Sequence, residues 1–219
     1  MAQLIAYSKI QRVVDALCIA ILMLGIVLMM VKLNAYNPGL IIFWLLPLQF
    51  FIAALAADFF SGLAHFLGDN PISQNPWLAK WFYRGFYNHH IEPTEMTRHD
   101  FVETNGLNAA GASIILFPSL YFLPQPHDLL STSLCIFALF LSFMVFMTNQ
   151  IHKWSHTNNP PGFVSVLQKH NLILNPRNHI KHHLKHDRYY CITTGWLNAL
   201  FFKIQFWEKM TGLGVGDKD

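Results

Sequence analysis

Histidine is the residue type that best equips this chain for chemistry. Most of its 12 histidines fall into short groups, namely His89-His90, His152-x-x-x-His156 and His179-x-x-His182-His183. Imidazole is the commonest metal ligand among protein side chains, and residues three or four apart share one face of a helix. Such groups on several helices can meet at one metal centre. They hold more imidazoles than a four-coordinate ion needs, which indicates two metal ions.

Adjacent and closely spaced residues limit how such a centre is built. His89 and His90 diverge by about 100° on a regular helix. Both can therefore bind metal only if they serve different ions or the backbone bends. His65 and Asp69 are four residues apart at the end of an apolar segment, which puts both on one helix face.

Further polar residues could complete or support these groups. His99 is expected to be a ligand, while Asp100 and Glu103 could ligate, orient His99 or begin the next helix. Asp58 lies near a membrane boundary, where it either reaches water at a helix end or holds the second ring nitrogen of a ligand. Asn149 shares a helix face with the first histidine of the HKWSH motif.

Several other kinds of site are excluded. The sequence has no H-E-x-x-H zinc-protease motif and no G-x-S-x-G nucleophile motif. Cys18, Cys135 and Cys191 have no C-x-x-C spacing, so neither a cysteine metal site nor a disulfide framework is expected. Spacing alone allows iron, zinc or copper for the histidine groups.

The composition predicts a membrane protein. Hydrophobic residues make up 53% of the 219 residues and charged residues only 12%, against about 25% charged in soluble domains. The net charge of +3 is mild, and no basic tract indicates a nucleic-acid partner. We expect one integral-membrane domain, residues 1–219, whose first apolar segment is a retained anchor and not a cleaved signal.

Four segments are long or apolar enough to be expected to cross a bilayer, which takes about 20 residues of helix. They are residues 13–31, 40–57 with an extension to 66, 107–122 and 129–147. Segments 68–106 and 148–219 then lie on the cytosolic side with both termini, because this arrangement leaves only Lys32 of the 15 basic residues at the opposite boundary. The predicted fold is an all-α membrane protein with about four transmembrane helices and a cytosolic, histidine-rich helical cap.

The predicted topology also gathers the histidines. All of the 12 except His127 fall on the cytosolic side, although they were not used to choose the orientation. His127 is expected to be a loop residue, and His170 and His186 are left outside the ligand set with their roles open.

Five strings of this sequence resemble the Kua/CarF-type lipid desaturases: DFFSGLAHF, RGFYNHHIEPTEMTRHDFVETNG, TNQIHKWSHT, HIKHH and YYCITTGWLN. The resemblance runs from about Asp58 to Trp207, nearly 70% of the chain. The resemblance implies a multispan membrane enzyme with a di-iron centre. By position, the implied metal ligands are His65, Asp69, His89, His90, His99, His152, His156, His179, His182 and His183.

The resemblance also implies a reaction. It would use O₂ as co-substrate, two iron ions, a membrane phospholipid and a small electron carrier of the cytochrome b or ferredoxin type. The motifs are closer to the branch that converts 1-O-alkyl (plasmanyl) ethanolamine phospholipid to the vinyl-ether plasmalogen. The alternative is desaturation of an acyl chain of phosphatidylglycerol or another glycerolipid, and departures from the family pattern at Gly85, Asn88 and Glu92 leave the head group open. The membrane would be the endoplasmic reticulum of a eukaryote or the inner membrane of a bacterium.

A histidine-rich metal transporter is the rival from another class. Transport predicts polar residues at membrane depth and ligands on both sides. Here the fourth apolar segment has no charge, the first has only Asp15 at its edge, and the histidines lie on one side. The sequence therefore favours an enzyme.

Overall fold

The computed structural model describes residues 7–71, 73 and 75–212, and these residues form helices and loops with no strand. The predicted all-α class is confirmed for them, while the end of the predicted cytosolic tail, residues 213–219, lies outside this part. The helices are α1 (Lys9–Leu33), α2 (Ile41–Asp69), α3 (Pro76–Leu78), α4 (Arg84–Ile91), α5 (Phe101–Phe122), α6 (Leu129–His156), α7 (Gly162–Lys169), α8 (Pro176–Leu184), α9 (Leu197–Lys203) and α10 (Phe206–Gly212), with a π-helical turn η1 (Ala79–Tyr83) and a 3-10 turn η2 (Glu95–Arg98).

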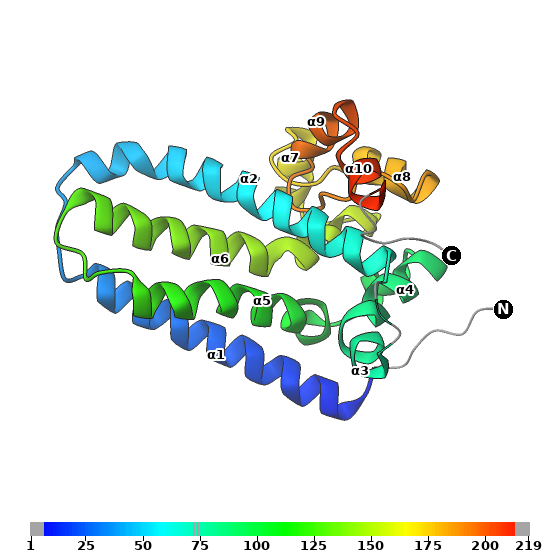
Figure 1. The fold of residues 1–219 in the computed structure, drawn as a ribbon, viewed down its shortest axis with the longest axis horizontal. Coiled ribbons are helices and arrows are strands. Elements are labelled where there is room, and N and C mark those ends of the chain that lie inside the picture. Colours follow the sequence, from blue (N-terminus) through cyan, green and yellow to red (C-terminus); the bar gives the residue numbers. More distant parts are fainter. Residues whose placement is uncertain (1–6, 72, 74, 213–219) are drawn as a thin grey trace.

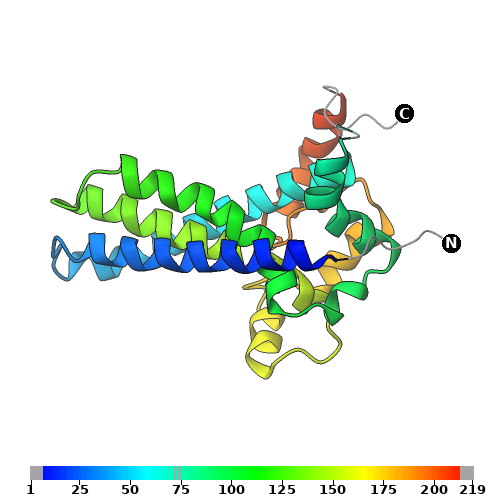
Figure 2. The same ribbon diagram turned by 90° about the horizontal axis from the view of Figure 1, so that it is seen from below.

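Four long helices lie side by side, and the short helices gather at one end of them (Figures 1 and 2). Helix α1 packs against α5, α5 against α6, and α6 against α2. Successive long helices run in opposite directions, so the last turns of α2 and α6 reach the same end as the first turns of α1 and α5 (Figure 1). This arrangement brings the histidines of α2 and α6 next to those of the short helices.

The starts of three long helices, α1, α5 and α6, follow local capping rules. Ser8 and Gln11 form a reciprocal capping box at α1, and Asp128 and Ser131 do the same at α6. The predicted third span begins at residue 107, but its helix begins at Phe101, because Asp100 accepts hydrogen bonds from the first-turn backbone N–H groups. Of the roles considered for Asp100, the structure therefore has it begin the helix.

Three of the described helices, α1, α2 and α6, are long and apolar enough to cross a membrane. Helix α5 is not among them, since polar residues such as Asn105 and Asn108, together with Pro118, lower its hydropathy. It nevertheless runs alongside α1 and α6 (Figure 1). The four predicted spans thus correspond to four long helices, of which three have the composition of a span.

Close contacts at two glycines bring the short helices onto α2. A Cβ atom at Gly68 would lie 2.3 Å from the ring of Phe86, so the absence of a side chain lets α4 approach. Six residues earlier, a Cβ atom at Gly62 would lie 2.7 Å from the Cys191 sulfur. The two glycines therefore let both α4 and the segment before α9 pack directly on the histidine-bearing end of α2.

Candidate metal centre

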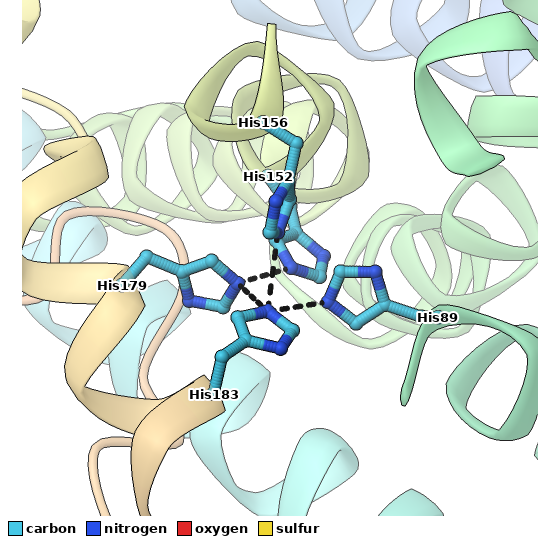
Figure 3. Close-up of side chains that lie close together, drawn as sticks. All are labelled: His89, His152, His156, His179 and His183. Atoms are coloured by element: carbon cyan, nitrogen blue, oxygen red, sulfur yellow. Dashed lines mark hydrogen bonds between the residues drawn. The ribbon is translucent and has the colours of Figure 1, made fainter. Parts of the chain in front are cut away.

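Five imidazoles from three short or terminal helical segments converge on one point (Figure 3). Each offers a ring nitrogen, and the five nitrogens all lie within 4.8 Å of one another. The residues are His89 from α4, His152 and His156 from α6, and His179 and His183 from α8. We call this set the first histidine group.

The distances within the first histidine group do not fit hydrogen bonding alone. His183 Nε2 lies 3.0 Å from His89 Nε2, 3.3 Å from His156 Nε2 and 3.0 Å from His179 Nε2. A neutral imidazole nitrogen either donates one proton or accepts at one lone pair. It therefore cannot satisfy three nitrogen neighbours at once, and a cation among them is the simpler explanation of the convergence.

The same distances match those around a shared metal ion. Two nitrogens about 2.1 Å from one ion lie about 3.0 Å apart when they are at right angles and about 3.4 Å apart at the tetrahedral angle. Four of the Nε2 separations in the group run from 2.8 Å, between His152 and His179, to 3.3 Å, between His156 and His183. The first histidine group therefore fits a transition-metal ion, whose preferred ligands include imidazole.

A second set of possible ligands lies beside the first: His65 and Asp69 from α2, His90 from α4 and His182 from α8. The carboxylate of Asp69 is at its centre, with Oδ1 2.8 Å from His90 Nε2. The other oxygen, Oδ2, lies 3.3 Å from His182 Nε2 and 3.5 Å from His65 Nε2. We call these four residues the second group.

Buried polar atoms without hydrogen bonds indicate that the second group could bind an ion. His65 and His182 are completely buried, and the Nε2 atoms of both face Oδ2 of Asp69 at 3.5 Å and 3.3 Å without the geometry of a hydrogen bond. Buried polar atoms without partners are costly. A metal ion between them would remove this cost, and the imidazole–carboxylate donor set suits one.

The two groups share helices, so they form one bipartite centre. The adjacent histidines of α4 divide between them, which meets the condition that His89 and His90 bind different ions if the helix is regular. On α8, His179 and His183 belong to the first group and His182 to the second. A third set, formed by His90, His183 and His186, joins the two groups at the protein surface.

Burial keeps the imidazoles in the form that binds metal. It lowers the pKa values of His89 and His179 well below the ordinary value, and nearby histidines lower them further. Burial and the neighbouring His156 likewise lower the pKa of His183 to about 3. These three imidazoles are therefore neutral at pH 7, as ligation requires. On the opposite edge of His182, Nδ1 lies 2.9 Å from the Arg188 carbonyl oxygen, which leaves Nε2 free for a metal.

Residues 54–213 match the family described as lipid desaturase domain. The chain belongs to this family. It is 42% identical over 168 residues to plasmanylethanolamine desaturase of Myxococcus xanthus, a match that covers 74% of this chain and 58% of that protein. It is 43% identical over 170 residues to plasmanylethanolamine desaturase 1 of Mus musculus, covering 74% and 62%.

A more distant relative is fatty acid desaturase 4 of Arabidopsis thaliana, a chloroplastic protein that is 31% identical over 156 residues, covering 67% of this chain and 45% of that protein. The matched part of this chain spans about three fifths of the length of the two more similar relatives. No solved structure matches the chain.

Nine of the ten expected ligands lie in the two groups, and His99 lies in neither. His99 Nε2 is 2.8 Å from Glu95 Oε1 and 3.7 Å from Glu103 Oε1. Its backbone carbonyl accepts a hydrogen bond from Lys153. Glu103 thus lies against His99, as the role of orienting that histidine requires. It also pairs with Arg84.

Asp58 has a role different from both that were considered for it. It is completely buried, and it contacts backbone rather than water or a histidine. Its Oδ1 accepts from the N–H groups of Thr194 and Gly195, both at 2.8 Å, and Oδ2 accepts from Leu197 at 3.0 Å. The turn that contains Thr194 and Gly195 is also bonded to the segment just before α8, where the Leu174 N–H donates to the Thr193 carbonyl. Asp58 is therefore connected through this turn to the segment that precedes α8.

The remaining histidines and Asn149 are placed as follows. His186 is exposed but belongs to the third set, and its Nε2 lies 2.9 Å from the His183 carbonyl. His170 is exposed after α7. His127 is exposed in the loop before α6, at the far end of the bundle, as expected for a loop residue. Asn149 is half-buried on α6, one turn before the first histidine group.

Proposed function

We propose that the chain is a membrane lipid desaturase that binds two iron ions and uses O₂ to convert plasmanyl ethanolamine phospholipid to the vinyl-ether plasmalogen. The observation that carries the proposal is the pair of adjacent ligand groups sharing α4 and α8. The identity of 42–43% to two plasmanylethanolamine desaturases supports the choice of reaction.

The ligands of each ion follow from the grouping. The first histidine group would hold one ion, and the second group, with its single carboxylate, would hold the other. A reduced iron pair with O₂ supplies the oxidising power to remove two hydrogens from neighbouring carbons, which side chains lack. The balance of O₂ reduction to two waters requires two further electrons, for which we propose a small one-electron carrier. His99 has no place in either ligand set.

The height of the site suits carbons next to the head group. His65 is 24 residues from the start of α2 and His152 is 23 residues from the start of α6, about 35 Å along each helix at 1.5 Å per residue. The apolar core of a bilayer is about 30 Å thick. The ligands would therefore lie at the head-group level, where the two carbons beside an ether oxygen also lie.

The proposed topology has four spans, with α5 as the third. Helix α5 packs between α1 and α6, so protein neighbours rather than lipid contact part of its surface and its polar residues are tolerated. For example, Asn108 Nδ2 donates to the Val145 carbonyl at 2.8 Å. The cap and the described ends of the chain would lie on the cytosolic side, in accordance with the basic residues.

Desaturation of a phosphatidylglycerol acyl chain is the second candidate, supported by the 31% identity to the plant fatty acid desaturase. The two reactions are separated by expressing the chain in a host supplied with alkyl ether phospholipid and analysing its lipids by mass spectrometry. Acid-labile vinyl ethers, absent with the His183→Ala variant, would support the proposal. A new double bond in an acyl chain without vinyl ether would replace it with the second candidate.

Metal transport remains the rival from another class. Both ligand groups lie at one end of the bundle, and no cluster of possible ligands is found at the other end of the described helices. A transport route would need sites across the membrane. The one-sided arrangement therefore favours an enzyme.

A further inference from the structure

A non-helical turn in the cap contacts α2 well before the histidine-bearing end of that helix. The three backbone N–H groups bound by Asp58 belong to the segment Thr194–Leu197, which ends as α9 begins. Close by, the Ile192 N–H donates to Ser61 Oγ at 3.1 Å. Trp196, in the turn itself, has its ring centroid 5.4 Å from that of Phe51.

The helical rise gives the height of these contacts. Asp58 is 17 residues and Phe51 is 10 residues after Ile41, the first residue of α2, which puts them about 26 Å and 15 Å along the helix. A helix that starts at one face of the apolar core leaves it after about 30 Å, and tilting the helix only brings both residues deeper. If α2 crosses the membrane as proposed above, Asp58 and Phe51 both lie within the apolar core.

The backbone of the turn is satisfied as a membrane interior requires. Non-helical backbone is tolerated at membrane depth only where its polar groups are bonded within the protein. Asp58 accepts from all three N–H groups of the turn that point towards α2. The indole N–H of Trp196 donates to the Asn171 carbonyl at 2.6 Å. The bonds satisfy these N–H groups at a depth where lipid cannot bond to them.

The exposed side of α9 is mainly apolar, as is the exposed side of α2. Leu200 and Ile204, one helical turn apart, are 50% and 42% exposed. Phe201, on the inner face, contacts Phe59 of α2, whose neighbour Phe60 is itself 45% exposed on that helix. Exposed apolar side chains are thus present on both of these packed helices, whereas Lys203 provides a charged group that can reach the head groups.

We propose that residues 193–204, the turn and α9, are a re-entrant element inserted into the leaflet on the histidine side of the membrane. Its exposed side faces the acyl-chain layer of that leaflet, which Leu200 and Ile204 contact directly. The cap would then be only partly in water. The inserted part of the cap would lie at the level of the acyl chains. There it would pack against α2, the helix that carries the proposed metal ligands His65 and Asp69.

Spin labels at single cysteines test the insertion without any measurement of activity. Cys18, Cys135 and Cys191 are replaced by Ala, and one cysteine is introduced at Leu200→Cys, with Ile204→Cys as the substitute if that protein does not fold. The labelled protein is reconstituted in phosphatidylcholine–phosphatidylglycerol vesicles. The accessibility of the label to O₂, which concentrates in lipid, is compared with its accessibility to a water-soluble nickel chelate.

Two control positions calibrate the reading. Phe60→Cys reports the lipid-facing side of α2, and Leu184→Cys, 76% exposed at the end of α8, is expected in water. A label at Leu200 that resembles Phe60, with O₂ accessibility several-fold above that of nickel, supports the insertion. Nickel accessibility equal to that at Leu184, or low accessibility to both reagents because protein covers the site, overturns it. A Phe60 label in water would instead refute the proposed path of α2.

Discussion

Replacing Asp58 by asparagine should destabilise the protein far more than an ordinary polar substitution on a helix. The substitution preserves size but leaves one acceptor oxygen where there were two. That oxygen can keep the bonds from Thr194 and Gly195, as a neutral acceptor. The new amide NH₂ group then faces the Leu197 N–H, so two buried donors oppose each other.

The magnitude follows from the bonds affected. A hydrogen bond to a charged group contributes about 1.5–3 kcal/mol, roughly twice a neutral one. Losing one and weakening two should cost about 3–5 kcal/mol. For a chain of 219 residues, each kcal/mol shifts Tm by about 2–4 °C, so Asp58→Asn should melt about 6–20 °C lower than wild type.

Asp100→Asn is the matched control, because Asp100 also accepts from first-turn N–H groups but is half exposed. Asparagine caps helices about as well as aspartate, and an exposed ion pair contributes at most about 1 kcal/mol. Thermal unfolding of both purified variants in detergent, followed by size-exclusion chromatography, measures the difference. If Asp58→Asn melts within 2 °C of Asp100→Asn, the role assigned to Asp58 is wrong.

Three further outcomes are expected. Gly68→Ala should push Phe86 and α4 away from α2, cost about 1–3 kcal/mol and lower metal content, whereas Gly85→Ala, which meets no atom within 4 Å, should be neutral in the same metal analysis. His183→Ala should reduce bound metal and abolish vinyl-ether formation measured by lipid analysis, while His127→Ala should change neither. The metal-free protein should lose stability on acidification, because the folded-state pKa values of His89, His179 and His183 lie below the unfolded value of about 6.5. The unfolded chain therefore takes up more protons as the pH falls. The Tm of the metal-free protein should be level above about pH 6.5 and fall from there towards about pH 3; a Tm that rises on acidification would contradict this.

Local rules explain why part of this centre could be predicted. The spacing of His152 and His156 and that of His179 and His183 fix shared helix faces, which the structure retains. The divergence of His89 and His90 likewise follows from helix geometry, and the two residues lie in different groups. Hydropathy located the long helices, although it placed the start of α5 late because capping by Asp100 depends on hydrogen bonding and not on hydropathy.

Contacts between distant segments explain what could not be predicted. Asp58 is 136 residues from Thr194, and no periodicity connects an acidic residue on a helix to a turn so far along the chain. Two local signals were present. Asp58 is a charged residue in an apolar helix, and Gly195 permits the positive φ of 75° that the turn requires. The ring of His99 lies against Glu95 and Glu103, which are close to it in sequence, and not among the distant histidines, so its role as a ligand stays a prediction.

The most direct test of the central claim is the metal content of the purified protein, measured by elemental mass spectrometry against amino-acid analysis. Two adjacent ligand groups predict two ions per chain, and the proposed reaction predicts that both are iron. Two iron ions per chain, reduced to about one when Asp69→Asn weakens the second group, would agree with the account. A single tightly held zinc ion in the wild-type protein would contradict it.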